Sequence, residues 1–390
     1  HRVTGIDIVP EKVMKIANGV NPTYEKELTE ALRRVKINAT TDFHHVLGSD
    51  ISFLCVGTPD NADGSIDLRY VKGAAEQLAQ LLKEKRTSHL VVVRSTVVPG
   101  TTEKIVAPCF KDLPEVGVCV NPEFLQEGTA LEDFLTPSRI VIGEDGRRWG
   151  DMLLDLYNGT ADSSSVLRTD LRTAEMIKYA SNAFLATKVS FINEIGNICK
   201  ELGIDVYEVA RGMGHDNRIG KDFLKAGIGF GGFCLPKDTA ALMMKGKETG
   251  YTPKILQEVL QLNREQPLRM LELLKIHIPS LSNKVIGILG LAFKPGTDDI
   301  RESRAIPVVE ALLKEGARVR AFDSQAMPNF QKLFPQIEYC GVDEVLASDA
   351  TLIVTAWDEF NRLDYSNSIV IDGRRIDAAK RAQIYEGVCW

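Results

Sequence analysis

The sequence has little that would place this protein in a membrane, on a nucleic acid or in an oxidising compartment. No apolar run approaches the roughly 20 residues that a membrane-spanning helix needs, and the run 285–293 has only the length of a strand. The net charge is −6 and the basic residues form no cluster, which argues against nucleic acid as a partner. The chain opens on polar and strand-like residues, so no secretory signal peptide is expected.

Cysteine is also sparse and unpatterned. The chain has seven cysteines, an odd number, without Cys-x-x-Cys or Cys/His metal-ligand spacing. This predicts no disulfide framework, no metal site and a reducing, cytoplasmic location. What remains is the composition of an ordinary globular protein, 44% apolar and 26% charged, and its 390 residues are enough for two or three domains.

The first part of the chain alternates between strand-like and helix-like segments. We expect helices from Pro10 to about Asn18 and over 68–85, and strands over 1–9, 35–40, 51–56, 90–96 and 116–120. The near-continuous valine run in 90–96 is typical of a parallel strand that is buried on both faces. Strands that alternate with helices predict a doubly wound α/β sheet built from βαβ units.

The glycine-rich fingerprint of a dinucleotide-binding sheet is missing from this part. Such a sheet normally starts with a strand, a Gly-x-Gly-x-x-Gly turn and a helix, and an acidic residue follows about 20 residues on. Asp7 ends the first predicted strand, where that acidic residue would stand, but no fingerprint precedes it. We therefore expect the first βα unit to be absent from this chain, through truncation or as a variant without a complete cofactor site. On its own, Asp7 is equally well an acid in a surface turn.

A long helix is predicted over 170–202, which contains no proline and a single glycine, Gly196. Its length would be on the order of 45–50 Å at 1.5 Å per residue. It is apolar on nearly all sides, which predicts burial between two domains and against a second subunit. Lys178 and Asn182 stand one turn apart on one face of it, although a lysine in such a helix more often extends to solvent.

The segment 227–238 is the most unusual stretch of the chain. It has four glycines in six residues, which would let a ligand lie against the backbone. The glycine-rich part leads to Cys234. Pro236, which stiffens the turn, follows the cysteine, and Lys237 and Asp238 come next. A nearby ammonium group stabilises a thiolate, the nucleophilic form of cysteine. A lone Gly-Gly-x-Cys is more often a turn beside a buried cysteine, but the whole string favours a reactive one.

A second set of βαβ units begins at Lys284. Gly287 and Gly290 would let a helix pack close to the first strand, as in half of a nucleotide-binding fold. We expect a helix over 303–315 and strands over 285–291, 318–322 and 352–356.

Two polar segments of this third part stand out. The segment 293–303 is too polar and too charged for a simple linker. The last predicted strand closes on Asp372-Gly373-Arg374-Arg375, and this arginine pair suits a diphosphate because guanidinium groups match phosphate oxygens.

Taken together, these segments resemble the nucleotide-sugar 6-dehydrogenases, the UDP-glucose/GDP-mannose dehydrogenase family. The similarity runs from Asp7 to about Gly387, and the cysteine loop, the Lys178 helix, the segment 293–301 and the Asp-Gly-Arg-Arg close occur in the family's order. The resemblance implies two Rossmann-like domains joined by a long central helix and a small helical domain. The domains would be an NAD-binding domain (1–168, without its first βα unit), a central helical domain (169–280) and a UDP-binding domain (281–390).

The resemblance also implies a reaction, the oxidation of a sugar C6 hydroxymethyl group to a carboxylate by two NAD. Cys234 would form a thiohemiacetal and then a thioester, while Lys178 and Asn182 stabilise the oxyanions. Asp238, with a water held by Thr96, would be the base of the alcohol step.

The segment 121–127, Asn-Pro-Glu-Phe-Leu-Gln-Glu, would supply further groups of this site. Its two carboxylates, Glu123 and Glu127, are four residues apart and would share one face of a helical turn. By resemblance, Glu127 activates the water that hydrolyses the thioester. The family commonly has arginine where this chain has Gln126, which leaves the local charge balance open. Solvated surface acids are the ordinary alternative.

The remaining expected contacts follow from the same resemblance. A carboxylate at Asp7 would favour NAD over NADP, because it repels a 2′-phosphate. The expected NAD contacts are Asp7, Lys12, Val56, Gly57, Thr58, Pro59, Thr96, Glu127, Lys237 and Arg301. The expected substrate contacts are Glu123, Phe124, Leu125, Lys178, Asn182, Arg218, Phe223, Gly227, Gly231, Cys234, Phe293, Lys294 and Arg374, with Arg218 reaching the sugar of a neighbouring subunit in a homodimer.

Several functions stay open at this point. UDP-glucose is the favoured substrate because the segments 293–301 and 355–360 look most like that branch, and the alternatives are GDP-mannose and UDP-N-acetylmannosamine. A β-hydroxyacid dehydrogenase of similar fold would use a lysine without the nucleophilic Cys234. A non-catalytic nucleotide-sugar binding protein is the alternative from another class.

Overall fold

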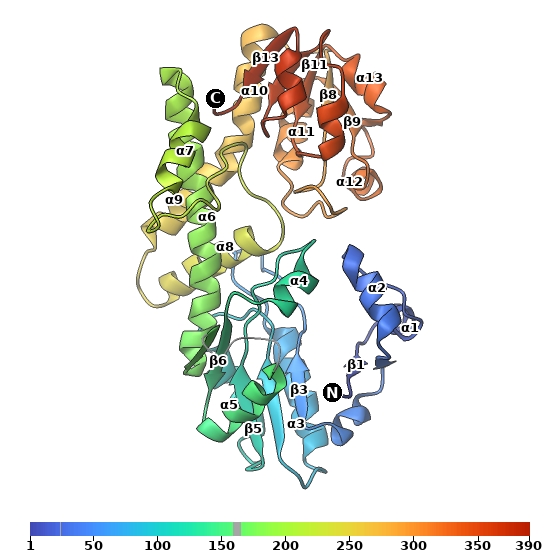
Figure 1. The fold of residues 1–390 in the computed structure, drawn as a ribbon, viewed down its shortest axis with the longest axis vertical. Coiled ribbons are helices and arrows are strands. Elements are labelled where there is room, and N and C mark those ends of the chain that lie inside the picture. Colours follow the sequence, from blue (N-terminus) through green and yellow to red (C-terminus); the bar gives the residue numbers. More distant parts are fainter. Residues whose placement is uncertain (24, 159–164) are drawn as a thin grey trace. The chain divides into compact units, whose positions relative to one another are not determined.

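The computed structural model describes residues 1–23, 25–158 and 165–390. The chain divides into two compact units, His1–Ser181 and Asn182–Trp390, and helix α6 (Leu171–Leu202) runs from the first into the second (Figure 1). Among the helices described, none is long and apolar enough to cross a membrane. Each unit is an α/β structure, as the sequence predicts, and each is considered by itself.

The first unit contains a five-stranded sheet of order β3-β4-β5-β6-β7. Its neighbours are parallel except for β5 and β6, which are antiparallel, a pairing that the sequence did not indicate. The other two strands, β1 and β2, form a separate parallel pair. The strands are β1 (Thr4–Ile6), β2 (Asn38–Thr40), β3 (Ile51–Leu54), β4 (His89–Val93), β5 (Val116–Val120), β6 (Ile140–Glu144) and β7 (Val166–Thr169).

Helices cover both faces of this sheet. All five residues of β4 are buried, which confirms the expectation from its valine run. Alternate residues of β4 contact α3 on one face and α5 on the other, because side chains alternate along a strand. The helices and short helical turns are α1 (Pro10–Ala17), α2 (Lys26–Arg34), η1 (Phe43–Gly48), α3 (Arg69–Leu82), η2 (Thr102–Val106), η3 (Ala107–Phe110), α4 (Ala130–Leu135), α5 (Arg147–Leu154) and η4 (Asp155–Tyr157).

The second unit contains a six-stranded, all-parallel sheet of order β10-β9-β8-β11-β12-β13. Counted along the chain this is the order 3-2-1-4-5-6, that of a complete dinucleotide-binding fold rather than half of one. The Asp-Gly-Arg-Arg segment follows β12, and β13 comes after it, so the prediction that this segment closes the last strand is wrong. The strands are β8 (Val285–Leu289), β9 (Arg318–Phe322), β10 (Glu338–Tyr339), β11 (Ala350–Ile353), β12 (Ile369–Asp372) and β13 (Ile384–Gly387).

This sheet is also covered on both faces. Ile286 and Ile288 of β8 pack with α10 and α11, whereas Leu289 packs with α13 and the turns η7 and η8. Gly287 allows the close approach of a helix, since a Cβ there would lie 2.5 Å from the Val345 carbonyl oxygen of α13. The elements are α11 (Ala305–Lys314), α12 (Met327–Leu333), α13 (Val342–Leu346), η7 (Asp358–Arg362) and η8 (Asp377–Arg381).

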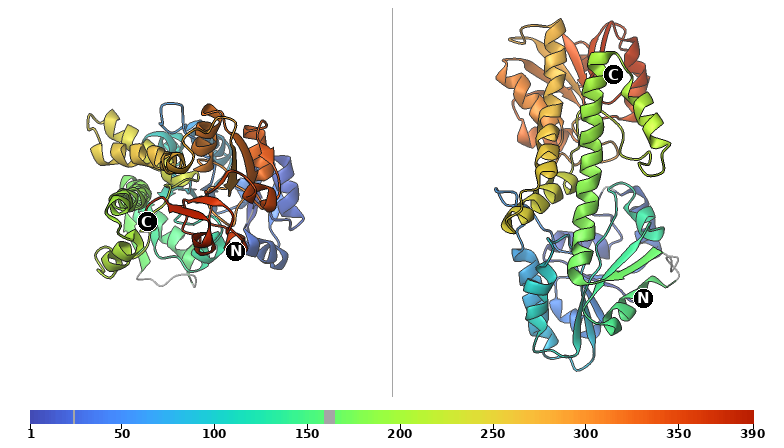
Figure 2. Two further views of the ribbon diagram at one scale, coloured as in Figure 1. Left: turned by 90° about the horizontal axis from the view of Figure 1, so that it is seen from above. Right: turned by 90° about the vertical axis from the view of Figure 1, so that its left-hand side faces the viewer.

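The helical part of the second unit follows α6, whose continuous course is visible in Figure 2. The sequence pattern predicts a single helix over 251–273, but the structure has two, α9 and α10, separated by the turn η6. Pro267 lies in that turn and has no N–H to continue a helix. The elements are α7 (Val206–Gly214), α8 (Cys234–Glu248), α9 (Lys254–Glu265), η6 (Gln266–Leu268) and α10 (Arg269–His277).

Candidate active site

The candidate nucleophile, Cys234, is the first residue of α8, and its side chain is exposed. The expected turn after the thiol is therefore the first turn of a helix, with Pro236 inside it at a position where a missing N–H costs nothing. Unpaired N–H groups at a helix N-terminus stabilise negative charge, as a thiolate requires.

A buried polar network lies within the second unit on α6 and α8. The side-chain NH2 of Asn182 donates to one oxygen of Asp238 at 2.7 Å, and the ammonium of Lys237 donates to the other at 2.5 Å. All three side chains are buried. The arrangement brings together three residues predicted from the sequence, and it fixes the Asp238 carboxylate in one orientation.

The four glycines of the segment 227–232 lie against other parts of the second unit. A Cβ at Gly227 would lie 2.5 Å from the Gly373 carbonyl oxygen, and one at Gly229 would lie 2.4 Å from Oδ1 of Asn263. At Gly231 and Gly232 the nearest atoms would be the Glu302 carbonyl oxygen at 2.3 Å and the Phe293 ring at 2.7 Å. The protein's own packing therefore requires these glycines. The sequence pattern alone favours a ligand against their backbone instead.

The Asp-Gly-Arg-Arg turn packs on the same loop. The carboxylate of Asp372 accepts the backbone N–H groups of Arg374, Arg375 and Ile376, and burial raises the pKa of Asp372 to about 6. Arg374 donates to the carbonyl oxygens of Val354 at 2.7 Å and of Gly229 at 3.3 Å. Its burial lowers the pKa of Arg374 to about 10.

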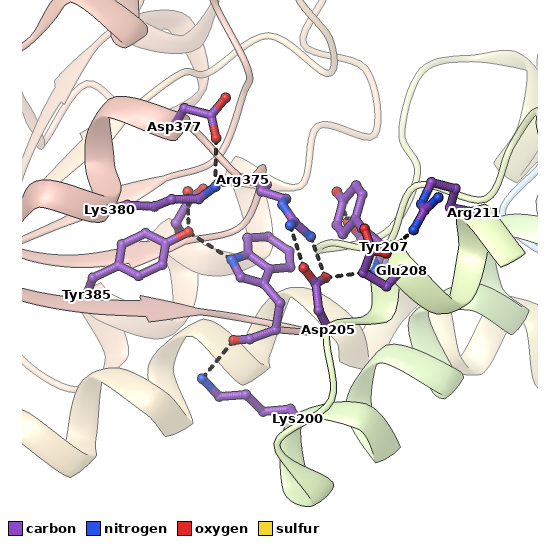
Figure 3. Close-up of polar contacts among 12 residues, drawn as sticks. Lys200, Asp205, Tyr207, Glu208, Arg211, Arg375, Asp377, Lys380 and Tyr385 are labelled. Atoms are coloured by element: carbon purple, nitrogen blue, oxygen red, sulfur yellow. Dashed lines mark hydrogen bonds and ion pairs between the residues drawn. The ribbon is translucent and has the colours of Figure 1, made fainter.

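Arg375 has a different environment, shown in Figure 3. Its two terminal nitrogens each donate to one oxygen of Asp205 at 2.6 Å. The guanidinium lies over the rings of Tyr207, at 4.2 Å, and Trp390, at 5.9 Å. This pairing occupies both terminal nitrogens of Arg375.

The segment 293–301 also meets the cysteine loop. The Phe293 ring packs on Gly232, and Lys294 lies over the same ring at 5.5 Å. Arg301 forms a bidentate pair with Asp299 and lies 4.7 Å over the ring of Phe233, the residue before the thiol. The structure thus places the expected residues of this segment beside the loop that carries Cys234.

In the first unit, Lys178 of α6 is buried and forms an ion pair with Glu123 at 3.0 Å. The other oxygen of Glu123 accepts the N–H of Leu125 at 2.6 Å, and the Phe124 ring lies 5.5 Å from the ammonium of Lys178. Lys178 therefore does not extend to solvent. The segment 121–126 forms neither helix nor strand, and Glu127 lies in the turn that follows it, so the expected helical turn shared by Glu123 and Glu127 is absent.

The carboxyl ends of β3 and β4 bring the segments 56–59 and 95–97 together. The hydroxyl of Thr58 donates to the Thr96 carbonyl oxygen at 2.9 Å, and that of Ser95 donates to the Val56 carbonyl oxygen at 2.6 Å. At the end of β1, Lys12 lies 3.7 Å from the Asp7 carboxylate, whose Oδ1 accepts the N–H of Val9 at 2.8 Å. Thr58 and Ser95 thus link the carboxyl ends of β3 and β4, the edge where the sequence predicts a cofactor site, whereas Asp7 and Lys12 follow β1 in the separate two-stranded pair.

The structure also describes three further predicted site residues, Arg218, Phe223 and Glu127. Arg218 is exposed and forms a bidentate pair with Asp216. Phe223 has a left-handed backbone, with φ of 62°, and Glu127 is exposed in the turn before α4.

Four buried polar residues were not singled out as site residues. Asn193, Asn263 and Gln266 hydrogen-bond the backbone of the cysteine loop, and Glu175 accepts the N–H groups of Gly100 at 2.5 Å and Thr102 at 2.8 Å. Burial raises the pKa of Glu175. In the sequence they are ordinary polar residues, and nothing in their spacing distinguishes a buried anchor from a surface position.

Two Rossmann-like sheets joined by a long helix are the features of a nucleotide-dependent dehydrogenase. The chain belongs to the UDP-glucose/GDP-mannose dehydrogenase family. Family models match the NAD binding domain at residues 1–161, the central domain at 172–265 and the UDP binding domain at 287–378.

Individual relatives are similar over nearly the whole chain. UDP-glucose 6-dehydrogenase AglM of Haloferax volcanii is 43% identical, covering 100% of this chain and 94% of its own length. UDP-glucose 6-dehydrogenase TuaD of Bacillus subtilis is 38% identical, covering 98% and 86%. A solved UDP-glucose dehydrogenase structure from Pyrobaculum islandicum has a TM-score of 0.96 and 42% identity, covering 100% of this chain and 92% of that chain.

Proposed function

We propose that this protein oxidises the C6 hydroxymethyl group of UDP-glucose to a carboxylate, consuming two NAD and one water and forming UDP-glucuronate and two NADH. The observation that carries the proposal is the position of Cys234, at the N-terminus of α8 and four residues before the buried Asp238 network. Oxidation of an alcohol to an aldehyde needs only a base and a hydride acceptor. Continuing to the acid requires a covalent bond between the enzyme and the aldehyde carbon, which a thiolate can form.

The covalent steps are assigned to the chain's own residues. The sulfur of Cys234 adds to the C6 aldehyde and forms a C–S bond, giving a thiohemiacetal whose oxidation leaves a thioester. Lys178 and Asn182 donate to the oxyanions, with a contribution of about 3 kcal/mol per donor in comparable sites. Asp238 is the base of the alcohol step. Water activated by Glu127 then breaks the C–S bond and releases the carboxylate and the thiol.

The residues present fit NAD. The Asp7 carboxylate stands at the carboxyl end of β1, where it would accept hydrogen bonds from a ribose and repel the 2′-phosphate of NADP. Lys12, the segment 56–59 and Thr96 are its expected neighbours, and Arg301 and Lys237 are expected to contact the diphosphate side. NAD, when bound, supplies the hydride acceptor for both oxidations.

The nucleotide-sugar is assigned to the backbone of 227–232 and to the side chains around it. Arg374 binds the diphosphate side, supported by its place against Gly229. Phe293 and Lys294 face the nucleotide, and Phe223 with the backbone of 123–125 holds the hexose. We also keep the division into domains 1–168, 169–280 and 281–390 as part of this proposal.

A homodimer through α6 completes the proposal. Phe184, Phe191 and Ile198 are large apolar residues spaced seven apart on that helix, and all three are exposed in the single chain. A contiguous apolar stripe of this kind marks a protein interface. Arg218 would then contact the sugar bound by the partner.

The test is NADH formation by the protein in its natural length with UDP-glucose, GDP-mannose or UDP-N-acetylmannosamine. We expect two NADH per UDP-glucose and no turnover of the other two. One NADH per sugar would contradict the covalent role of Cys234, and turnover of another sugar would change the substrate. Tight binding of one sugar without turnover would favour a binding protein instead.

A further inference from the structure

The loop 227–232, which leads to the thiol, is fastened by buried amide side chains. Oδ1 of Asn263 accepts the Phe230 N–H at 2.8 Å, and the NH2 of the same side chain donates to the Phe230 carbonyl oxygen at 3.0 Å. One side chain thus satisfies both backbone groups of one loop residue, as a neighbouring strand would.

Two further amides fasten the start of the loop. Oδ1 of Asn193 accepts the Gly227 N–H at 2.8 Å, and the NH2 of Gln266 donates to the Gly227 carbonyl oxygen at 2.8 Å. Gln266 is itself held by Asn197, which donates to it at 2.8 Å and accepts from it at 3.0 Å. These amides therefore bind the loop at Gly227 and Phe230 to three different elements, α6, α9 and η6, in addition to the bonds of Gly229 with Arg374 and of the Gly232 N–H with the Arg301 carbonyl oxygen.

Asn263 is itself held in place by contacts other than those with the loop. Its own carbonyl oxygen accepts a hydrogen bond from Arg304 at 3.1 Å, and Arg304 also donates to the Glu302 carbonyl oxygen. Asn263 and Arg304 are both buried. The Phe230 ring packs in a small core with Ala186 and Val259, so the backbone bonds and the ring hold the same residue.

We propose that Asn263, supported by Asn193 and Gln266, is a positioning residue that sets the place of Cys234 and of the loop backbone for the reaction. Phe230 lies four residues before the thiol, and glycines fill most of the interval. Such a segment has little stiffness of its own. Its conformation is therefore imposed from outside, by the amide bonds to Phe230 together with the bond of the Gly232 N–H to the Arg301 carbonyl oxygen. The inference rests on the proposed function for its kinetic readout, but the geometry can be tested without it.

The central variant is Asn263→Leu, which keeps a side chain of similar size and removes both bonds to Phe230. We expect a 10- to 100-fold loss of kcat/KM, at the scale of about 10²-fold that a misplacement of about 1 Å can cost. The loss should fall mainly on kcat, because the thiol is displaced. Gln261→Leu removes an exposed amide from the same helix and should leave both constants unchanged. Both variants are assayed well below their melting temperatures, with folding checked by circular dichroism.

The conservative variant is Asn263→Asp. An ionised aspartate can accept from the Phe230 N–H but cannot donate to its carbonyl oxygen, whereas a protonated one can do both. The ratio of variant to wild-type kcat should therefore rise as the pH falls, measured at each pH well below the melting temperatures of both proteins so that the folded fraction does not change. A ratio independent of pH contradicts the proposal.

A measurement on the unmodified protein keeps the proposal testable if the leucine variant does not fold. Hydrogen exchange should show the Phe230 amide protected far more than that of Gly250, which lies in a turn after α8. Equal exchange at the two amides, or a folded Asn263→Leu protein with wild-type kcat and KM, would overturn the inference. If the protein has no activity on UDP-glucose, the proposed function fails, while the exchange result still decides the geometry.

Discussion

The pair formed by Asp205 and Arg375 gives a stability prediction that can be worked from the structure. Asp205 is the N-cap of α7, where its Oδ1 accepts the Tyr207 N–H at 2.9 Å. It also binds both terminal nitrogens of Arg375. Asp205→Ala removes both roles, whereas Asp205→Asn keeps an oxygen for the cap and loses the charge.

The two roles have separable magnitudes. Loss of an N-cap costs about 1 kcal/mol. A bidentate charged pair is worth about 1–2 kcal/mol here, after a reduction for solvent screening, because 38% of the Asp205 side chain is exposed. We therefore expect Asp205→Ala to lower the free energy of unfolding by about 2–3 kcal/mol and Asp205→Asn by about half as much. At about 2–4 °C per kcal/mol for a unit of this size, the alanine variant should melt about 5–10 °C lower.

The effect should depend on pH in a fixed direction. The hydrogen bonds from Arg375 are the largest cause that lowers the pKa of Asp205 below its ordinary value of 3.8. A carboxyl with a lowered folded-state pKa stabilises the protein fully above its unfolded pKa, and that stabilisation disappears as the pH falls through the folded value. The difference in melting temperature should be constant near neutral pH and shrink below about pH 4. Differential scanning calorimetry across this range is the assay, and equal melting of wild type and Asp205→Ala at neutral pH would refute the reasoning.

Four further outcomes are expected. Cys234→Ser should stop at the aldehyde, since a hydroxyl lacks the nucleophilicity of a thiolate, and full uronate production measured by mass spectrometry would contradict this. Arg374→Lys should raise KM for UDP-glucose about tenfold, whereas Arg375→Lys should lower the melting temperature and leave KM within about twofold. Glu175→Gln should cost about 1–3 kcal/mol in denaturant titrations. Because burial raises the pKa of Glu175 from 4.5, wild-type stability should decline as the pH rises from that value to the folded pKa, and the variant should lack this slope. Phe191→Asp should convert a dimer to a monomer in light scattering, and a dimer that persists would contradict the α6 interface.

The regular elements with the strongest local patterns could be predicted from the sequence. The strands β5 and β9 have the expected bounds, and α6 begins within one residue of its expected start. Each is a continuous apolar run or a long segment without proline. The strands β6, β7, β10 and β13 were not predicted. β7, β10 and β13 have at most four residues, too few for a clear pattern, but β6 has five, like β5 and β9, so short length does not explain every case. The break at Pro267 was missed because the apolar spacing continues across it.

The residues of the candidate site were also predictable only in part. The motif residues Cys234, Lys178 and Asp238 stand out because reactive groups at fixed spacing are rare in a chain. The residues that support them do not stand out. Asn263 and Glu175 are ordinary polar residues on helices, and only their burial shows that they hydrogen-bond the backbone of other segments. Burial of a polar side chain is a tertiary property, so helical spacing alone does not reveal it.

The glycines of the cysteine loop have a packing role that the sequence did not indicate. Their number suggested a backbone exposed to a ligand, yet each Cβ would collide with the second unit itself, for example with Gly373 or Phe293. The loop is therefore in place before any substrate binds, since its conformation is imposed by protein atoms. A nucleophile held in advance does not have to be ordered when the aldehyde forms. The glycines and the buried amides thus act together. The glycines let the loop approach the protein closely, and the amides hold it there.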